Sequence, residues 1–408
     1  MKNFIFFVII IFSLVYTNSD AQWELTSGAN GSTIRGFAVN DAGIFAGFTA
    51  RYDSAGVILS TDFGVNWSNV STGLPAREID GLFAHSSDLF ASENDAGIYI
   101  STDNGASWTV TGLTVAYIYY FASIGTNLFA GDFNNGVLLS TDNGATWNFV
   151  NSGLTNTSTR ALYAKGSNLF AGTRGGGVFL SSDNGTSWTA VNSGLTNHYI
   201  YALIHNGSNL FAGTYNSGVF LSTNNGTSWT AASNGLPSNT VVAFAVSGGN
   251  LFAGVDGSGV YLTTNNGSDW TDVTTGLTSL TIRALKVSGS YLYVGGENSG
   301  VWRRPLSEMI TGAEDEQNSL PESYALYQNY PNPFNPSTKI KYSVTQSSNV
   351  LLKVFNVLGN EIVTIVNEEK PAGTYEVQFN GTGLPSGIYF YKLQAGNFVE
   401  TKKMILLK

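Results

Sequence analysis

The chain has 408 residues, more than a usual single domain, which predicts two folded units plus targeting segments. Its 12% charged residues, 47 glycines and 13% aromatics favour short strands joined by tight turns over helices. A net charge of −9 gives little attraction for phosphate backbones, so nucleic acid is not expected as a partner. The absence of cysteine excludes disulfides and thiolate metal sites.

The N-terminus has the pattern of a secretory signal peptide. Lys2 precedes an apolar run over residues 4–16, and a small-residue site, Ser19-Asp20-Ala21, follows it. We expect cleavage after Ala21, so that residues 1–21 are absent from the mature chain. The run is too short to span a membrane, and no later segment reaches the ~20 apolar residues that a spanning helix needs.

A repeat of about 41 residues fills the next part of the chain. Successive tryptophans are separated by 41, 39, 41, 41 and 41 residues: Trp67, Trp108, Trp147, Trp188, Trp229 and Trp270. One unit reads T-R-A-L-Y-A from Thr159, N-L-F-A-G-T from Asn168, G-V-F-L-S from Gly177 and S-W-T-A-V from Ser187. These are four short strands bounded by turn residues, which is the pattern of a β-propeller blade.

Both ends of the repeat array are incomplete. Trp23-Glu24-Leu25-Thr26 reads as an outermost strand with no earlier strands before it. Residues 282–287, 291–295 and 300–303 supply three strands, and Pro305 then ends the pattern. If the N-terminal strand completes the last sheet, residues 22–310 form a seven-bladed β-propeller that protects its strand edges.

Six repeats carry a hairpin of the form S-x-D-x-G-x-x-W, or a close variant, at residues 60–67, 101–108, 140–147, 181–188, 222–229 and 263–270. These hairpins resemble Asp-boxes, also called bacterial neuraminidase repeats. The resemblance implies a propeller like those of sialidases, xyloglucanases, sortilin-type receptors and photosystem II assembly factors. Asparagine replaces the acid in two hairpins, keeping the acceptor and losing the charge, so we predict structural rather than catalytic roles for Asp62, Asp103, Asp142, Asp183, Asn224 and Asn265.

A ligand is expected on the opposite face, where loops enter each innermost strand and join the second and third strands. Aligning the repeats places one residue of each blade near the channel mouth: Arg35, Asp80, Tyr120, Arg160, Tyr201, Val242 and Arg283. The second-to-third loops add Arg51, Tyr52, Asp53, Glu93, Asp95, Asp132, Phe133, Arg174, Tyr215, Asn216, Asp256, Glu297 and Asn298.

Arginine and tyrosine at a concave mouth suit an anionic or planar partner. The predicted ligand-binding residues are Arg35, Asp80, Tyr120, Arg160, Arg174, Tyr201, Tyr215 and Arg283. The alternative is a rim of solvated loops with no specific ligand.

An enzyme is the less favoured interpretation. A sialidase places an Arg-Ile-Pro element near the first blade, but Gly36-Phe37 follows Arg35, and no Tyr-Glu nucleophile setting is recognisable. A xyloglucanase-like inverting mechanism needs two carboxylates ~6.5–9.5 Å apart, and the sequence does not pair Asp80, Asp132 or Asp256. We therefore expect no catalytic residues.

Neither a metal nor a cofactor is expected. The three histidines fall in two blades without the spacing of metal ligands: His85, His198 and His205.

Residues 311–323 form a polar stretch that we interpret as a linker. From residue 324 alternating apolar residues and turn signals predict a small immunoglobulin-like β-sandwich. Residues 327–338, the Leu358-Gly359 turn, residues 371–375 and 384–389 and the last lysine-bearing strand resemble the type A sorting domain of the type IX secretion system.

That resemblance implies a Bacteroidota-type bacterium and export across its outer membrane. It also implies that residues 324–408 engage the translocon and a sortase-like peptidase, with the propeller released or attached at the surface. We expect a monomeric, secreted or surface propeller that binds a glycan or a protein. The alternative is a sialidase- or xyloglucanase-like glycoside hydrolase on the same scaffold, and the fold alone does not choose between them.

Overall fold

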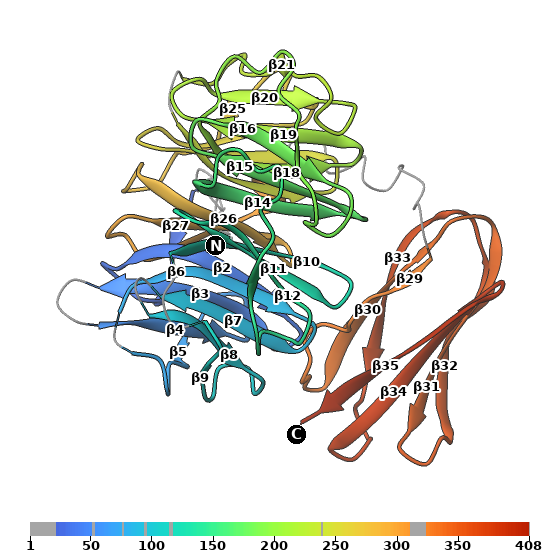
Figure 1. The fold of residues 1–408 in the computed structure, drawn as a ribbon. Helices are drawn as coiled ribbons and strands as arrows, with labels where there is room; N and C mark the ends of the chain where they lie inside the picture. The colour runs from blue at the N-terminus through green and yellow to red at the C-terminus, as the bar shows by residue number, and fades with distance from the viewer. Residues whose placement is uncertain are drawn as a thin grey trace, which may run out of the picture. The chain divides into compact units, whose positions relative to one another are not determined.

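The computed structural model describes residues 22–50, 54–75, 77–93, 96–113, 117–237, 240–310 and 324–407. The predicted signal peptide and linker lie outside these residues. The chain divides into two compact units, Met1–Ile310 and Thr311–Lys408. Both units are built from β-strands in their described parts (Figure 1).

Within residues 22–310 the described chain forms seven four-stranded antiparallel sheets, six of them from four consecutive strands. The first strands are β2 (Thr33–Asn40), β6 (Ile79–His85), β10 (Ile118–Ile124), β14 (Thr159–Lys165), β18 (Ile200–Asn206), β22 (Val241–Ser247) and β26 (Ile282–Ser288). The second strands are β3 (Gly43–Ala50), β7 (Asp88–Glu93), β11 (Asn127–Asp132), β15 (Asn168–Thr173), β19 (Asn209–Thr214), β23 (Asn250–Val255) and β27 (Tyr291–Gly296).

The third strands are β4 (Ser54–Ser60), β8 (Gly97–Ser101), β12 (Gly136–Ser140), β16 (Gly177–Ser181), β20 (Val219–Ser222), β24 (Gly259–Thr263) and β28 (Val301–Pro305). Two-residue fourth strands complete the sheets: β5 (Ser68–Asn69), β9 (Thr109–Val110), β13 (Asn148–Phe149), β17 (Thr189–Ala190), β21 (Thr230–Ala231), β25 (Thr271–Asp272) and β1 (Glu24–Leu25). A 3-10 helix, η1 (Leu306–Glu308), follows β28.

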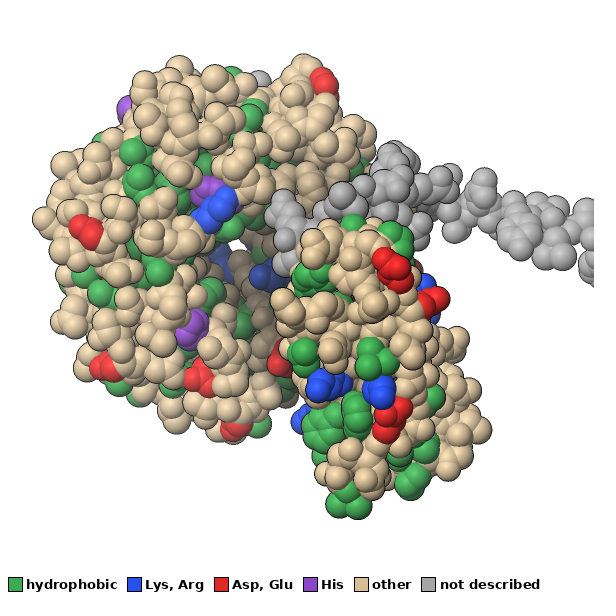
Figure 2. Space-filling model, turned by 90° about the vertical axis from the view of Figure 1, so that its right-hand side faces the viewer, with side chains coloured by type: hydrophobic (Ala, Val, Ile, Leu, Met, Phe, Trp, Pro, Cys, Tyr) green, Lys and Arg blue, Asp and Glu red, His purple; other side chains and the backbone are tan. Residues whose placement is uncertain are grey.

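The first strands contact one another in a closed ring: β2 with β6, β6 with β10, β10 with β14, β14 with β18, β18 with β22, β22 with β26, and β26 with β2. They are therefore the innermost strands. Figure 2 shows one face of this unit hollowed at its centre, with Lys or Arg side chains inside the hollow.

The predicted pairing of the two ends of the array is confirmed. Strand β1 pairs antiparallel with β28, with Glu24 opposite Arg303 and Leu25 opposite Trp302. The Trp23 indole Nε1 donates to the Val273 carbonyl of the preceding sheet at 2.8 Å. The N-terminal strand therefore links the sixth sheet to the seventh.

The apolar core lies between sheets. In β15 the consecutive residues Leu169, Phe170 and Ala171 are all fully buried, because neighbouring sheets cover both faces of the strand. A glycine follows, and a Cβ on Gly172 would lie 2.5 Å from Cγ2 of Ile200 in the next sheet. The repeated N-L-F-A-G segment therefore forms a strand that is buried on both faces, and at its glycine the next sheet approaches the backbone closely.

The repeated hairpins share one network of hydrogen bonds. In the fourth sheet Asp183 Oδ1 accepts from Ser181 Oγ at 2.8 Å and from the Ser187 amide at 2.9 Å. Asn224 Oδ1 accepts the corresponding bonds in the fifth sheet at 2.9 and 2.8 Å, so asparagine keeps the geometry. The turn itself needs positive φ at two successive residues, for example Asn184 at 56° and Gly185 at 80°, which explains the Asn-Gly pairs.

The second unit contains two facing sheets. One has the order β29 (Ala325–Leu326), β30 (Ser337–Val344), β33 (Gly373–Asn380). The other has the order β32 (Glu361–Lys370), β31 (Ser348–Asn356), β34 (Gly387–Ala395), β35 (Phe398–Leu406), and Figure 1 shows β30 and β33 on the side opposite β31, β32, β34 and β35. One apolar core joins them, with Ile340 and Tyr342 from the first sheet against Leu352 and Tyr391 from the second.

Two P-x-G-x-Y segments of this unit form the same turn. Tyr375 Oη donates to the Pro371 carbonyl at 2.7 Å, and Tyr389 Oη donates to the Pro385 carbonyl at 2.8 Å. The upstream proline-rich segment is fixed by Phe334, which is buried and whose amide donates to the Ile405 carbonyl of the last strand at 2.9 Å. The motifs singled out in the sequence are thus packing and turn elements of one small domain.

Candidate functional site

In each innermost strand the pairing with the second strand shifts by one residue just after the first buried residue. The unpaired residue at this point is a β-bulge. A bulge bends the strand and redirects the side chain that it carries. The seven bulged residues are Arg35, Asp80, Tyr119, Arg160, Tyr201, Val242 and Arg283, and all line one central cavity of about 290 Å³.

One position of the sequence alignment was wrong. In β10 the bulge falls on Tyr119, between the paired residues Ile118 and Tyr120, so Tyr119 and not Tyr120 is equivalent to Arg160. This repeat has 39 rather than 41 residues, so counting from the tryptophans does not fix the position. Tyr120 takes the next place, where the other six strands carry Gly or Ala, and its Oη donates to the Tyr201 carbonyl at 3.3 Å.

Two of the three arginines that line the cavity have carboxylate partners. Arg35 Nη2 lies 3.4 Å from Glu78 Oε2, and its Nε lies 3.7 Å from Asp80 Oδ1. Arg283 Nη2 donates to Glu297 Oε2 at 2.6 Å, and its Nη1 lies 3.5 Å from Asp256 Oδ2. Their charges are already partly compensated within the protein.

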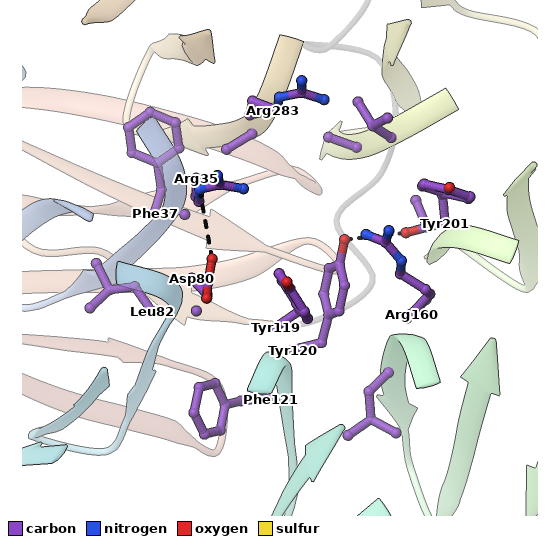
Figure 3. A pocket seen from close by; sticks show the side chains of 18 of the residues that line it. Arg35, Phe37, Asp80, Leu82, Tyr119, Tyr120, Phe121, Arg160, Tyr201 and Arg283 are labelled. Carbon is purple, nitrogen blue, oxygen red and sulfur yellow. Dashed lines mark hydrogen bonds and ion pairs between the residues drawn. The ribbon is translucent and has the colours of Figure 1, made fainter. Parts of the chain in front are cut away.

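Arg160 has aromatic neighbours instead. The guanidinium carbon lies 4.8 Å from the ring centroids of Phe133 and Tyr201 and 5.5 Å from that of Tyr119. No carboxylate lies within ion-pair distance of Arg160 among the described residues, and its Nε is buried without a hydrogen-bond partner there. Figure 3 shows the guanidinium groups of Arg35, Arg160 and Arg283 turned toward the same central space.

The aromatic surface continues outward from Arg160. Tyr201 and Tyr215 stack with centroids 5.9 Å apart, and Tyr199 lies 6.3 Å from Tyr215. Tyr215 is 47% exposed, so this end of the cluster faces solvent. Sequence reasoning missed Tyr199, although the Tyr-Ile-Tyr run at the start of β18 was a visible signal.

Arg174 does not join the cavity. It follows β15 with an exposed side chain, and its backbone forms an isolated bridge with Tyr199. The second-to-third loops do meet the loops that enter the innermost strands, as predicted: the Phe133 amide donates to the Tyr117 carbonyl at 2.9 Å, and the Tyr215 amide donates to the Tyr199 carbonyl at 3.0 Å. Arg51, Tyr52, Asp53 and Asp95 lie outside the described residues.

Below the bulged residues, two further layers of side chains line the cavity. The next residue along each strand is small in six sheets, the exception being Tyr120. The residue after that is large and apolar in all seven: Phe37, Leu82, Phe121, Leu162, Leu203, Phe244 and Leu285. The cavity therefore has a charged and aromatic mouth above an apolar floor.

Two acids of the predicted loop rim, Asp132 and Glu93, are buried. Asp132 Oδ1 accepts the Asn134 and Asn135 amides at 2.7 and 2.9 Å, so this carboxylate caps its own loop. Glu93 is 1% exposed, and both its oxygens lack hydrogen-bond partners among the described residues. The sequence placed these acids in the polar rim of the loop face, and in the structure both side chains are buried instead.

Burial changes the ionisation of two carboxyls near the mouth. It raises the pKa of Asp80 to about 6, against the opposing effect of the Arg35 charge. It raises the pKa of Glu93 to about 8, against the opposing effect of Arg77. Glu93 lies opposite Ile79 in the β6–β7 ladder, so the two carboxyls occupy the same sheet rather than facing walls of a groove.

The repeated hairpins lie at the other end of the strands, with the first-to-second turns: Asn143 Nδ2 donates to Asp88 Oδ2 at 2.7 Å. None of their residues lines the cavity. His205 is buried there between Tyr163 and Phe170, and burial lowers its pKa to about 4. The described residues contain no group of three His, Cys, Asp or Glu side chains able to hold a metal ion.

The two units match two different protein families. Residues 328–407 match the secretion system C-terminal sorting domain. The protein is exported across the outer membrane. Its destination is the cell surface or the extracellular space, by the type IX secretion system that reads this domain. No helix in the described part of the chain is long and apolar enough to cross a membrane.

Residues 128–247 match the DUF6242 beta propeller domain, so the first unit is a β-propeller domain. Among curated proteins the sequence has no match. Solved structures with a similar fold include YCF48 bound to D1 peptide, with 15% identity and a TM-score of 0.55 over 69% of this chain and 94% of that one.

Two other similar structures are bacterial. The extracellular domain of the putative hybrid two component system BT3049 from B. thetaiotaomicron has 12% identity and a TM-score of 0.55, over 95% of this chain and 57% of that one. The GH74 xyloglucanase from Xanthomonas campestris has 14% identity and a TM-score of 0.54, over 79% of this chain and 59% of that one. Identities this low show a shared fold alone.

Proposed function

We propose that this protein is a secreted or surface-attached binding module. Residues 22–310 act as one seven-bladed propeller of the Asp-box type, which recognises a glycan or protein ligand at the mouth of its central cavity. Residues 324–408 act as an immunoglobulin-like sorting domain that engages the type IX translocon and a sortase-like peptidase. The mature protein acts as a monomer and needs no metal or cofactor.

The observation that carries this proposal is the convergence of the seven bulged side chains on one cavity. Structural stability alone does not require a bulge to present arginine or tyrosine there, because the strands below it pack through Leu, Phe and Ala. A rigid ring with a polar, aromatic mouth is a common ligand site. A protein of similar fold is known with a bound peptide, which supports a binding role.

A hydrolase is the second candidate, and one observation favours it. Asp80 lines the cavity with a pKa raised by burial to about 6, as a general acid requires, and GH74 enzymes share the fold. An inverting mechanism needs a second carboxylate across the site. Asp80 is the only acid among the described residues that line the cavity, so we favour binding without catalysis.

The test is a binding and hydrolysis screen on purified protein against glycan and peptide arrays, beside an Arg35, Arg160 and Arg283 to Ala triple variant. Binding without product release, lost in the variant, is the expected result. Product release that Asp80→Asn abolishes would establish the hydrolase instead. Equal binding by the triple variant would refute the cavity mouth as the site.

Sorting is tested separately by deleting residues 324–408 in a host with the type IX system. We expect the truncated protein to accumulate in the periplasm, whereas the full chain reaches the medium or the cell surface. Export of the truncated protein would contradict the assignment of partners.

A further inference from the structure

We propose that the cavity mouth binds a carboxylate carried on an apolar body, and that Arg160 receives the carboxylate. This inference rests on the binding function proposed above and names the ligand chemistry of the same site. The carboxylate is supplied either by a free small acid or by the C-terminal residue of a peptide, since both present the same group.

The first step of the argument is the state of the Arg160 guanidinium. The guanidinium carbon lies 4.8 Å from the ring centroids of Phe133 and Tyr201 and 5.5 Å from the ring centroid of Tyr119. Rings around a planar cation hold its orientation, while its N–H groups remain available for hydrogen bonds in the guanidinium plane. That arrangement suits a bidentate carboxylate.

The second step is the contrast with the other arginines of the mouth. Arg35 is paired with Glu78 and Asp80, and Arg283 with Asp256 and Glu297. Arg160 has no such partner among the described residues. The Arg160 charge does act on Asp80 and opposes the rise that burial causes in its pKa, but the two side chains form no ion pair. An incoming carboxylate can therefore pair directly with Arg160, whereas at Arg35 or Arg283 it must compete with carboxylates that are already bound.

The third step is the shape below Arg160. Its own strand continues with Ala161 and then Leu162, and the following sheet repeats this order with Ala202 and Leu203. The small residues leave space, and the leucines are less than a tenth exposed because they pack between sheets. A volume of about 290 Å³ suits a group the size of one amino-acid side chain or one aryl ring.

The same lining disfavours an acidic sugar. Sugars bind with their flat faces on aromatic rings and with hydrogen bonds to many hydroxyls. Arg160 already lies against Phe133 and Tyr201, and Tyr215 stacks on Tyr201. Few polar side chains line the lower cavity, so a hydroxyl-rich body would lose hydrogen bonds to water without replacement.

The experiment uses isothermal titration calorimetry on the purified full chain. Four probes are compared: 3-phenylpropionate, its amide, the peptide acetyl-Gly-Gly-Phe with a free C-terminus, and glucuronate. The variants are Arg160→Gln and, as a matched loss of one positive charge away from the cavity, Lys165→Gln, whose side chain is exposed on the opposite end of β14. Thermal unfolding checks that both variants fold.

We expect the acid to bind and its amide to bind roughly 10- to 100-fold more weakly, because a charge-assisted pair is lost. Arg160→Gln should reduce acid binding by a similar factor, and Lys165→Gln should not. Tighter binding of the peptide than of the free acid would identify a chain terminus as the source, and the reverse order would identify a small acid.

Equal binding of acid and amide, unchanged binding by Arg160→Gln, or preference for glucuronate would overturn the inference. So would the absence of acid binding up to about 10 mM. If the array screen still finds a ligand that the triple variant loses, the binding function stands and only the carboxylate assignment fails.

Discussion

Substitution of Trp23 tests whether the N-terminal strand closes the ring. Trp23 is 4% exposed and packs against Val273 of the sixth sheet and Trp302 of the seventh, so its side chain joins the two ends of the array. Trp23→Ala removes this contact and should lower the free energy of unfolding of the first unit by about 3–5 kcal/mol.

Trp23→Phe separates packing from hydrogen bonding. It keeps most of the apolar contact but removes the indole donor to the Val273 carbonyl. That carbonyl retains a second donor, Arg304 Nη1 at 3.1 Å, so the expected loss is only about 1 kcal/mol. Trp147→Phe is the matched control, because the buried Trp147 Nε1 has no hydrogen-bond partner among the described residues and its removal should be nearly neutral.

The measurement is urea unfolding followed by circular dichroism, together with hydrogen exchange of the β28 amides. Trp23→Ala should lower the unfolding midpoint of the whole unit and speed exchange in β28, since β1 is its hydrogen-bonded neighbour. An unchanged midpoint with unchanged β28 exchange would show that the sheets do not depend on this closure and would refute the reasoning.

Three further predictions follow from single side chains. Tyr391→Phe should destabilise the second unit by about 1–3 kcal/mol in thermal unfolding, because Tyr391 Oη accepts a hydrogen bond from the Asn329 amide at 2.7 Å and donates one to a backbone carbonyl. Tyr342→Phe is the control and should be tolerated, because it removes a buried hydroxyl that has no hydrogen-bond partner among the described residues. Equal losses of stability in the two variants would contradict this prediction. Burial raises the pKa of Glu93 from 4.5 to about 8, so the stability that its neutral carboxyl preserves is fully present below pH 4.5, falls as the pH rises from there and is lost by about pH 8. Glu93→Gln should flatten this limb and be the more stable protein at pH 8, and a pH profile parallel to that of the unsubstituted protein would disprove the assignment. Hydrogen bonds from the Ser187 side chain and backbone lower the pKa of Asp183, so its contribution to stability is present above pH 3.8 and is lost as the pH falls through the folded value. Asp183→Asn should keep the turn and make acid unfolding less steep. A folding defect at neutral pH would contradict the equivalence of aspartate and asparagine in this turn.

The repeat allowed most strands and turns of the first unit to be predicted from the sequence. Regular tryptophan spacing, four apolar segments per unit and Asn-Gly turns correspond to local rules that each repeat satisfies by itself. The pairing of the orphan N-terminal strand with β28 followed from counting strands at both ends. The two facing sheets of the second unit likewise agree with the alternating pattern from residue 324 onward.

The candidate site could be predicted only in part from the sequence. Arg35, Arg160, Tyr201 and Arg283 do lie together at the cavity, because every repeat places the same position there. The sequence did not distinguish Tyr119 from Tyr120, since the shorter repeat leaves the register open and a bulge is decided by hydrogen bonding between strands.

The sequence by itself determined the strands, the turns and the order of the two units, because these depend on residues close together in the chain. Only the tertiary structure decided which arginines form ion pairs and which one lies among aromatic rings. Glu297 follows β27 in the same sheet as Arg283, but Arg160 contacts Phe133 and Tyr201 from two other sheets. Burial of Glu93 and exposure of Arg174 were also decided there, since solvent access depends on how the sheets close around the axis and not on the type of residue in the loop.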